Sequence, residues 1–165
     1  MKKYISLKNM FFCFMMIFVM AFNTVNVQAG ALDYLGNTID GSVLTNENEA
    51  VGTYKSVARS KYLLEGFVRI TNNGNGYVGI GAGTECNVVC GTIKLNVYLE
   101  RSSGDGNFYS YMKWENVDYN EASLYLDKEV KVEKGYYYRL RGYHSCTKNG
   151  VIENGASRTN GIYIG

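Results

Sequence analysis

Hydrophobic and polar residues alternate along most of the chain after about residue 61. The clearest run has Ile93, Leu95, Val97 and Leu99 separated by polar or amphipathic residues, the period-two pattern of a strand with one buried face. No segment keeps a helical period for three turns. The pattern predicts an all-β protein with seven strands, at residues 62–70, 78–86, 93–100, 108–115, 124–132, 136–146 and 161–164.

Clusters of Gly, Asn and Asp separate these runs, and such clusters mark tight turns. They occur at residues 72–76, 104–106, 149–150 and 154–155. Short strands with regular turn signals are typical of two packed antiparallel sheets. We therefore predict a β-sandwich domain over residues 59–165.

The first 58 residues lack this alternation. Residues 1–29 place Lys2, Lys3 and Lys8 before an apolar run at 10–22 and end in Ala29, the order of a secretory signal peptide. The apolar run is shorter than the roughly 20 residues of a membrane span, so an uncleaved anchor is the less favoured alternative. Residues 30–58 are polar and aperiodic, which predicts a flexible, partly disordered lead-in. The sequence thus predicts a secreted, extracellular protein with no membrane span after cleavage.

Removal of the signal segment changes the charge of the protein. The chain has 17 basic and 15 acidic residues, and three of the basic ones lie in residues 1–29, so 14 basic residues remain and the net charge is −1. A nearly neutral protein has no long-range field to attract nucleic acid or an anionic membrane. We expect neither to be a main partner.

Tyrosines and arginines gather on the predicted outward positions of one sheet. If residues 138 and 140 face the core, the alternate positions of that strand face outward, and so do residues 98, 109 and 111 on neighbouring strands. The candidate binding residues are Tyr98, Tyr109, Tyr111, Tyr137, Arg139, Arg141, Tyr143 and Tyr163, with Lys113 beside them. Such surfaces stack on flat ligands such as sugars and also suit protein interfaces. The alternative is that these cross-strand pairs only stabilise the sheet.

Parts of the sequence resemble two known families. Residues 132–141 resemble the start of the sixth strand in fibronectin type III and related immunoglobulin-like domains, although the usual Pro before Gly135 is missing. That resemblance implies a seven-stranded immunoglobulin-like β-sandwich in which the Tyr138 hydroxyl binds nearby backbone. The segments 40–45, 70–76, 135–142 and 161–164 are similar to an uncharacterised family of secreted proteins of Gram-positive bacteria, a domain of unknown function. This second resemblance implies secretion and no particular activity.

Three cysteines follow the signal segment, namely Cys86, Cys90 and Cys146. In an oxidising compartment one pair is expected to form a disulfide, leaving one thiol. The immunoglobulin-like order implies a bridge from Cys146 to Cys86 or Cys90, and a tight Cys86–Cys90 loop is the other pairing. A zinc site of Cys86, Cys90, His144 and Cys146 is a further alternative, because residues 144 and 146 share a strand face and Cys₃His is a structural zinc set.

No common catalytic motif occurs in the sequence. His144 is the single histidine, and GxSxG, HExxH and phosphate-loop patterns are missing. We therefore predict no enzymatic activity and no cofactor. The favoured function is a secreted binding or adhesion module with an unknown glycan or protein ligand. A structural or self-associating surface protein is the alternative, and a small secreted hydrolase is the least favoured one.

Overall fold

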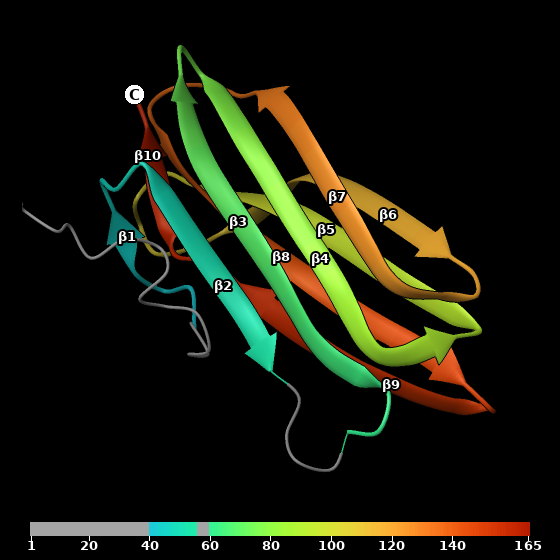
Figure 1. Ribbon diagram of the computed structural model, residues 1–165. Helices are drawn as coiled ribbons and strands as arrows, with labels where there is room; N and C mark the ends of the chain where they lie inside the picture. Colours follow the sequence, from blue (N-terminus) through green and yellow to red (C-terminus); the bar gives the residue numbers. More distant parts are fainter. Residues whose placement is uncertain (1–39, 56–59) are drawn as a thin grey trace, which may run out of the picture. The chain divides into compact units, whose positions relative to one another are not determined.

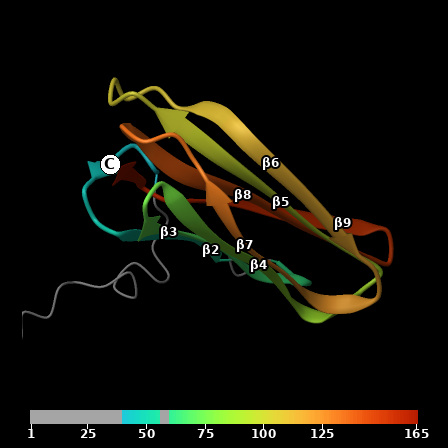
Figure 2. The same ribbon diagram turned by 90° about the horizontal axis from the view of Figure 1, so that it is seen from above.

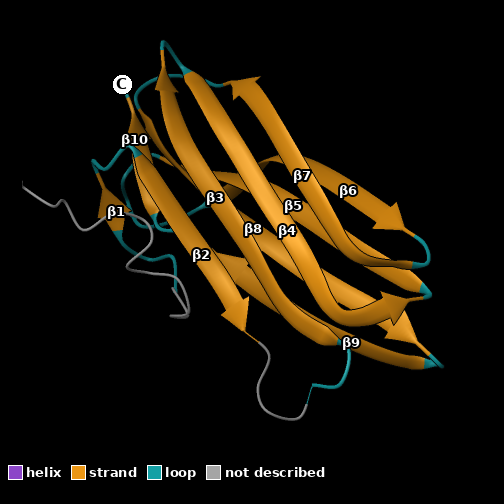
Figure 3. Ribbon diagram, in the orientation of Figure 1, coloured by secondary structure: helices purple, strands orange, loops and turns teal. Residues whose placement is uncertain are grey.

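The computed structural model describes residues 40–55 and 60–165. The predicted signal peptide at 1–29 and the first part of the predicted lead-in lie outside these residues. The described chain is all-β, with ten strands and no helix (Figure 3). No helix within the described ranges is therefore long and apolar enough to cross a membrane. The strands are β1 Leu44–Thr45, β2 Glu49–Lys55, β3 Leu63–Gly74, β4 Tyr77–Cys90, β5 Thr92–Ser102, β6 Tyr109–Asp118, β7 Glu121–Lys131, β8 Tyr136–Lys148, β9 Val151–Arg158 and β10 Gly161–Ile164.

The strands form two sheets that face each other (Figures 1 and 2). The first sheet has the order β1-β10-β8-β5-β6, and β9 also pairs with β8. Because β5 pairs with the whole of β8, both β9 and β10 share the other edge of β8, at opposite ends. The second sheet has the order β2-β3-β4-β7. Only β1 and β10 run parallel among the pairs within the described residues.

The described residues form ten strands, not the seven predicted. β1 and β2 lie within the predicted lead-in at 30–58, and β9 lies where the sequence predicted turns. The sequence of β2 shows no alternation of apolar and polar residues, so the strand was not predicted. The reason is that four consecutive residues, Ala50, Val51, Gly52 and Thr53, are all buried. Gly52 is covered by the backbone of Arg158, which a Cβ at this position would overlap. A strand buried on both faces cannot show the period-two pattern of a half-buried strand.

The alternating positions of β5 form the centre of the core, as the sequence predicted. Leu95, Val97 and Leu99 are buried, and Met112 and Trp114 of β6 pack against the same cluster. The buried ring of Tyr138 belongs to this cluster, and its hydroxyl donates a hydrogen bond to the Glu133 carbonyl oxygen at 2.8 Å. The core sits between the sheets and leaves the opposite side of β5 and β8 available for other contacts.

A second, smaller core lies at the end of the sandwich where β4 and β8 end. Leu63, Cys86, Cys90, Ile93 and Cys146 form it, with Tyr54, Tyr62 and Leu124 packed against them. The adjoining segment at the start of β3 is held by Glu153 of β9, whose carboxylate accepts hydrogen bonds from the Ser60 hydroxyl and from backbone N–H groups of the following residues.

Candidate functional site

The side of the first sheet that faces away from the second sheet is called the outer face here. Because Leu95, Val97 and Leu99 enter the core, the alternate residues of β5 project from the outer face. The register places Tyr98 opposite Lys113 of β6 on one side and opposite Arg141 of β8 on the other. Tyr143 lies two residues beyond Arg141 on the same face. We call these four residues, Tyr98, Lys113, Arg141 and Tyr143, the Tyr98 cluster.

The Tyr98 cluster is held by ring and cation contacts. The rings of Tyr98 and Tyr143 meet edge to face, with centroids 5.7 Å apart. The Arg141 guanidinium lies 4.9 Å from the Tyr98 centroid and 5.3 Å from that of Tyr143, and it donates a hydrogen bond to the Tyr143 hydroxyl at 2.8 Å. Lys113 lies 5.2 Å from the Tyr98 centroid on the opposite side. Tyr143 is still 41% exposed, so part of its ring is free to meet a ligand.

A second aromatic pair lies on the outer face near the C-terminal strand. Tyr137 of β8 pairs in register with Tyr163 of β10, and their ring centroids are 5.2 Å apart. Tyr163 is 39% exposed. The structure thus brings Tyr98, Arg141, Tyr143, Tyr137 and Tyr163 to one face, as the alternation predicted.

Arg139 lies on this face but is enclosed. Its Nε is 2.7 Å from Glu100, its Nη1 donates to the Gly41 carbonyl at 2.6 Å, and its guanidinium lies 3.9 Å from the Phe108 centroid. Glu100 is only 4% exposed and also forms an ion pair with Arg141 at 2.8 Å. A buried carboxylate needs such partners. Arg139, a predicted binding residue, is therefore committed to this network, and Glu100 is a structural member that the sequence did not single out.

Tyr109 and Tyr111 do not extend the outer face. The β5–β6 register shifts between Leu99 and Glu100, so that Tyr111 is left unpaired and Tyr109 pairs with Arg101. Tyr111 points to the core, where its ring centroid lies 5.6 Å from that of Tyr138. Tyr109 is 69% exposed, but it projects from the same side of the sheet as Arg101, not from the outer face. One extra residue in β6 has reversed the side predicted for both tyrosines.

His144 is buried between the sheets and does not join the cysteines. Its Nδ1 lies 2.9 Å from the Thr84 hydroxyl and its Nε2 lies 2.7 Å from the Ser157 hydroxyl. Burial lowers the pKa of His144 to about 4, although a backbone hydrogen bond at Gly83 acts in the opposite direction. A neutral imidazole with both nitrogens occupied is neither a metal ligand nor an accessible base. The Cys₃His zinc set suggested by the spacing is thus not assembled.

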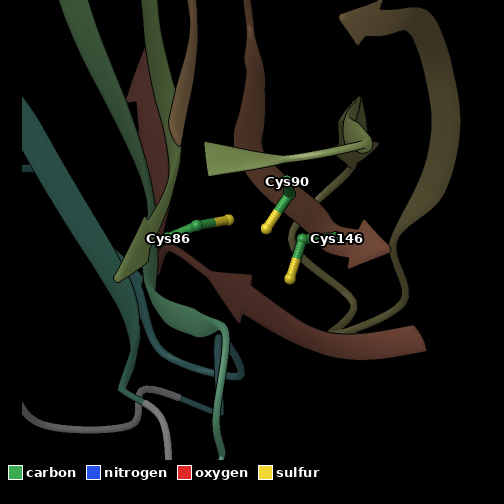
Figure 4. Close-up of side chains that lie close together, drawn as sticks. All are labelled: Cys86, Cys90 and Cys146. Atoms are coloured by element: carbon green, nitrogen blue, oxygen red, sulfur yellow. The ribbon is translucent and has the colours of Figure 1, made fainter. Parts of the chain in front are cut away.

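The three cysteines lie close together at the small core, as Figure 4 shows. Their Sγ atoms all lie within 4.8 Å of one another, and each residue is buried. Cys86 and Cys90 flank an outward bulge of β4 in which Asn87, Val88 and Val89 are exposed. Cys146 comes from β8 in the other sheet. All three are free thiols, so the predicted disulfide is not formed in the described part of the chain.

The environment of these thiols favours their neutral form. Burial raises the pKa of Cys86 far above its usual range, and the neighbouring Cys146 and Cys90 act in the same direction. Burial also raises the pKa of Cys146 to about 11. Thiols of this kind react slowly with solutes because the thiolate is the nucleophile. The arrangement gives no support to a Cys–His nucleophile.

A cavity of about 140 Å³ lies away from both groups of residues. Val43, Thr45, Glu47, Glu49, Ala50, Val51 and Asn160 line it. Its lining includes none of the tyrosines or arginines of the outer face and none of the cysteines.

One family model matches the chain, described as "Family of unknown function (DUF6147)", over residues 38–162. No curated protein matches the chain. The match covers β1 to β9 and the start of β10, so the Tyr98 cluster, Tyr137 and the three cysteines lie within it, and Tyr163 lies one residue beyond it.

Proposed function

The chain belongs to the DUF6147 family of unknown function, and we propose that it is a secreted, non-enzymatic binding module that recognises a partner protein. The proposed binding surface is the outer face of the first sheet, with the Tyr98 cluster and the Tyr137/Tyr163 pair as its contacts. The signal peptide predicted at residues 1–29 is the basis for secretion. The observation that carries the proposal is the grouping of exposed and partly exposed tyrosines with two cations, Arg141 and Lys113, on one side of a sheet.

The shape of this surface favours a protein over a small ligand. Sites for small molecules are concave and enclose most of the ligand, whereas the Tyr98 cluster lies on the side of a sheet. The cavity of about 140 Å³ is lined by none of these residues. Protein interfaces take much of their binding energy from tyrosine and arginine residues at their centre. A sheet face of this composition therefore suits the surface of another protein.

The contacts within the cluster prepare it for binding. Arg141 is fixed between the rings of Tyr98 and Tyr143, and Glu100 holds its guanidinium by an ion pair at 2.8 Å. Tyrosine has few rotatable bonds, so ordering it on binding costs little conformational entropy. A surface that is ordered before binding loses less free energy when the complex forms.

We also propose that β3 to β10 form an immunoglobulin-like arrangement. In such folds the first, second and fifth strands share one sheet, and the third, sixth and seventh share the other. Here β3, β4 and β7 share the second sheet, while β5, β6, β8 and the β9–β10 edge share the first. The hydrogen bond from Tyr138 to Glu133 supports the same assignment. In this arrangement β1 and β2 are additions at the N-terminal side.

Photo-crosslinking tests the binding surface. A benzoylphenylalanine placed at Tyr143 should give adducts with a partner protein when secreting cultures are irradiated. The matched control carries the same group at Tyr119, a tyrosine that is 65% exposed and lies in the β6–β7 turn. An adduct of twice the mass of the chain would favour the self-associating alternative. Equal adducts from both positions, or none from Tyr143, would refute the proposed surface.

A further inference from the structure

We propose that Cys86, Cys90 and Cys146 form a three-coordinate binding site for a soft, thiophilic metal ion, Cu(I). This site lies in the small core between the sheets and does not depend on the binding surface proposed above.

The first argument is the convergence of the sulfurs. Cys86 and Cys90 approach from the two sides of the β4 bulge, and Cys146 approaches from β8 (Figure 4). All three Sγ atoms lie within 4.8 Å of one another. An ion about 2.3 Å from each of three sulfurs in one plane would place the sulfurs about 4 Å apart. The three side chains thus need only a small movement to reach this geometry, whereas a disulfide would use two sulfurs and leave the third unused.

The second argument is the lack of a fourth ligand. Within the described ranges, no His, Asp or Glu side chain joins the three cysteines. His144 has both nitrogens next to the hydroxyls of Thr84 and Ser157. The apolar side chains packed around the three cysteines are Leu63, Ile93, Tyr54, Tyr62 and Leu124. Thiolate ligands suit zinc as well as Cu(I), but structural zinc sites are almost always four-coordinate, whereas Cu(I) accepts three sulfurs.

The third argument concerns charge. A metal ion binds thiolates, so it must displace the thiol protons. Burial disfavours thiolates that have no cation beside them, and the ion itself would offset one of the three thiolate charges. Lys148 adds a second positive charge at the rim, because its Nζ donates to the Val89 carbonyl at 2.6 Å, one residue before Cys90. The bound ion would connect β4 with β8 and thereby join the two sheets.

The test uses the chain purified from culture medium under nitrogen with a reductant. Cu(I) is supplied as its coloured bicinchoninate complex, and the loss of colour measures how much copper the protein withdraws. We expect one copper ion per chain, and X-ray absorption of the loaded protein should show three sulfur neighbours and no nitrogen. When Zn²⁺ is supplied as its complex with a chromophoric chelator, the protein should not withdraw the zinc from that chelator.

Single substitutions define the ligands. Cys86→Ala, Cys90→Ala and Cys146→Ala should each abolish withdrawal of copper, because alanine keeps a small apolar side chain but offers no sulfur. Ser145→Ala is the matched control on β8 and should bind one copper ion as the unmodified chain does. Circular dichroism shows whether each variant is folded, and the absorption spectrum of the unmodified protein decides the ligand set even if a variant does not fold.

Several results would overturn the site. The proposal is wrong if the reduced chain withdraws no copper, or if the alanine variants bind as well as the control. A nitrogen neighbour would instead indicate a site that includes His144, and zinc bound as tightly as copper would show that the site does not select Cu(I). A chain that is secreted with two of the three thiols joined, shown by a mass lower by two hydrogens and resistance to alkylation, would mean that the cysteines form a disulfide.

Discussion

Replacing Gly66 with alanine should destabilise the domain through one identifiable collision. Gly66 lies on β3, and a Cβ at this position would overlap the ring of His144 and come to 2.5 Å from its Nδ1. The ring cannot move away easily, because its two nitrogens are held by Thr84 and Ser157 at 2.9 and 2.7 Å. Gly142 on β8 also packs close to the ring, since a Cβ there would lie 2.9 Å from Nε2.

The size of the effect follows from these contacts. Inserting a methyl group into a filled core costs about 1–3 kcal/mol. Displacing the imidazole would also weaken two buried hydrogen bonds, each with a net contribution of about 1 kcal/mol. We therefore expect Gly66→Ala to lower the free energy of unfolding by about 3 kcal/mol. Gly81→Ala on β4 is the matched control, because its Cβ would find no atom closer than 3.6 Å.

A double-mutant cycle measured by urea denaturation tests the cause. His144→Ala removes the ring and should itself be destabilising, but Gly66→Ala in that background should cost less than about 0.5 kcal/mol, since the collision has gone. The coupling energy between the two positions should then approach the full cost of Gly66→Ala. If the two substitutions are additive, or if Gly81→Ala costs as much as Gly66→Ala, the packing of His144 described above is wrong.

Three further predictions concern buried polar groups. Because the pKa of His144 is about 4 in the folded chain and 6.5 for the free side chain, the unfolded state takes up the proton first as the pH falls. Stability should therefore be complete above pH 6.5 and fall by about 3 kcal/mol between pH 6.5 and 4, and urea midpoints for His144→Ala should lack this component. Glu100→Gln should cost about 3 kcal/mol, because it leaves the partly buried Arg139 without a countercharge; a melting temperature equal to that of the unmodified chain would contradict this. Tyr138→Phe should cost about 1 kcal/mol by losing its hydrogen bond to Glu133, and a thermal melt that does not shift would rule out that contribution.

Part of the fold could be predicted from the sequence because several strands are buried on one face only. The alternation in β5 gives the correct inward residues, and that of β8 follows the same rule. β2 and β9 could not be predicted in this way. In β9, Asn154-Gly155 looks like a turn, but Gly155 is a strand residue that a Cβ would bring into collision with the Tyr54 ring. A glycine stands at position 155 because the Tyr54 ring packs against it in the folded chain, and local sequence does not reveal this contact.

The candidate sites, like the fold, could be predicted from the sequence only in part. Alternation correctly placed Tyr98 and Tyr143 on one face, since both lie on regular, paired stretches of β5 and β8. It misplaced Tyr111 because the sequence does not mark the register shift in β6. The enclosure of Arg139 depends on Gly41 and Phe108, which are distant in sequence. Spacing grouped the three cysteines with His144, but the hydroxyls of Thr84 and Ser157 that occupy the imidazole lie on other strands.

The most direct test of the proposed function is the affinity of the chain for the protein that crosslinks from position 143. Tyr143→Ser should weaken this affinity by at least about tenfold, because a tyrosine at the centre of an interface commonly contributes 2 kcal/mol or more. Tyr119→Ser, in the β6–β7 turn, should leave the dissociation constant unchanged within about twofold. Equal affinities for the unmodified chain and Tyr143→Ser, with both proteins folded, would contradict recognition through the outer face.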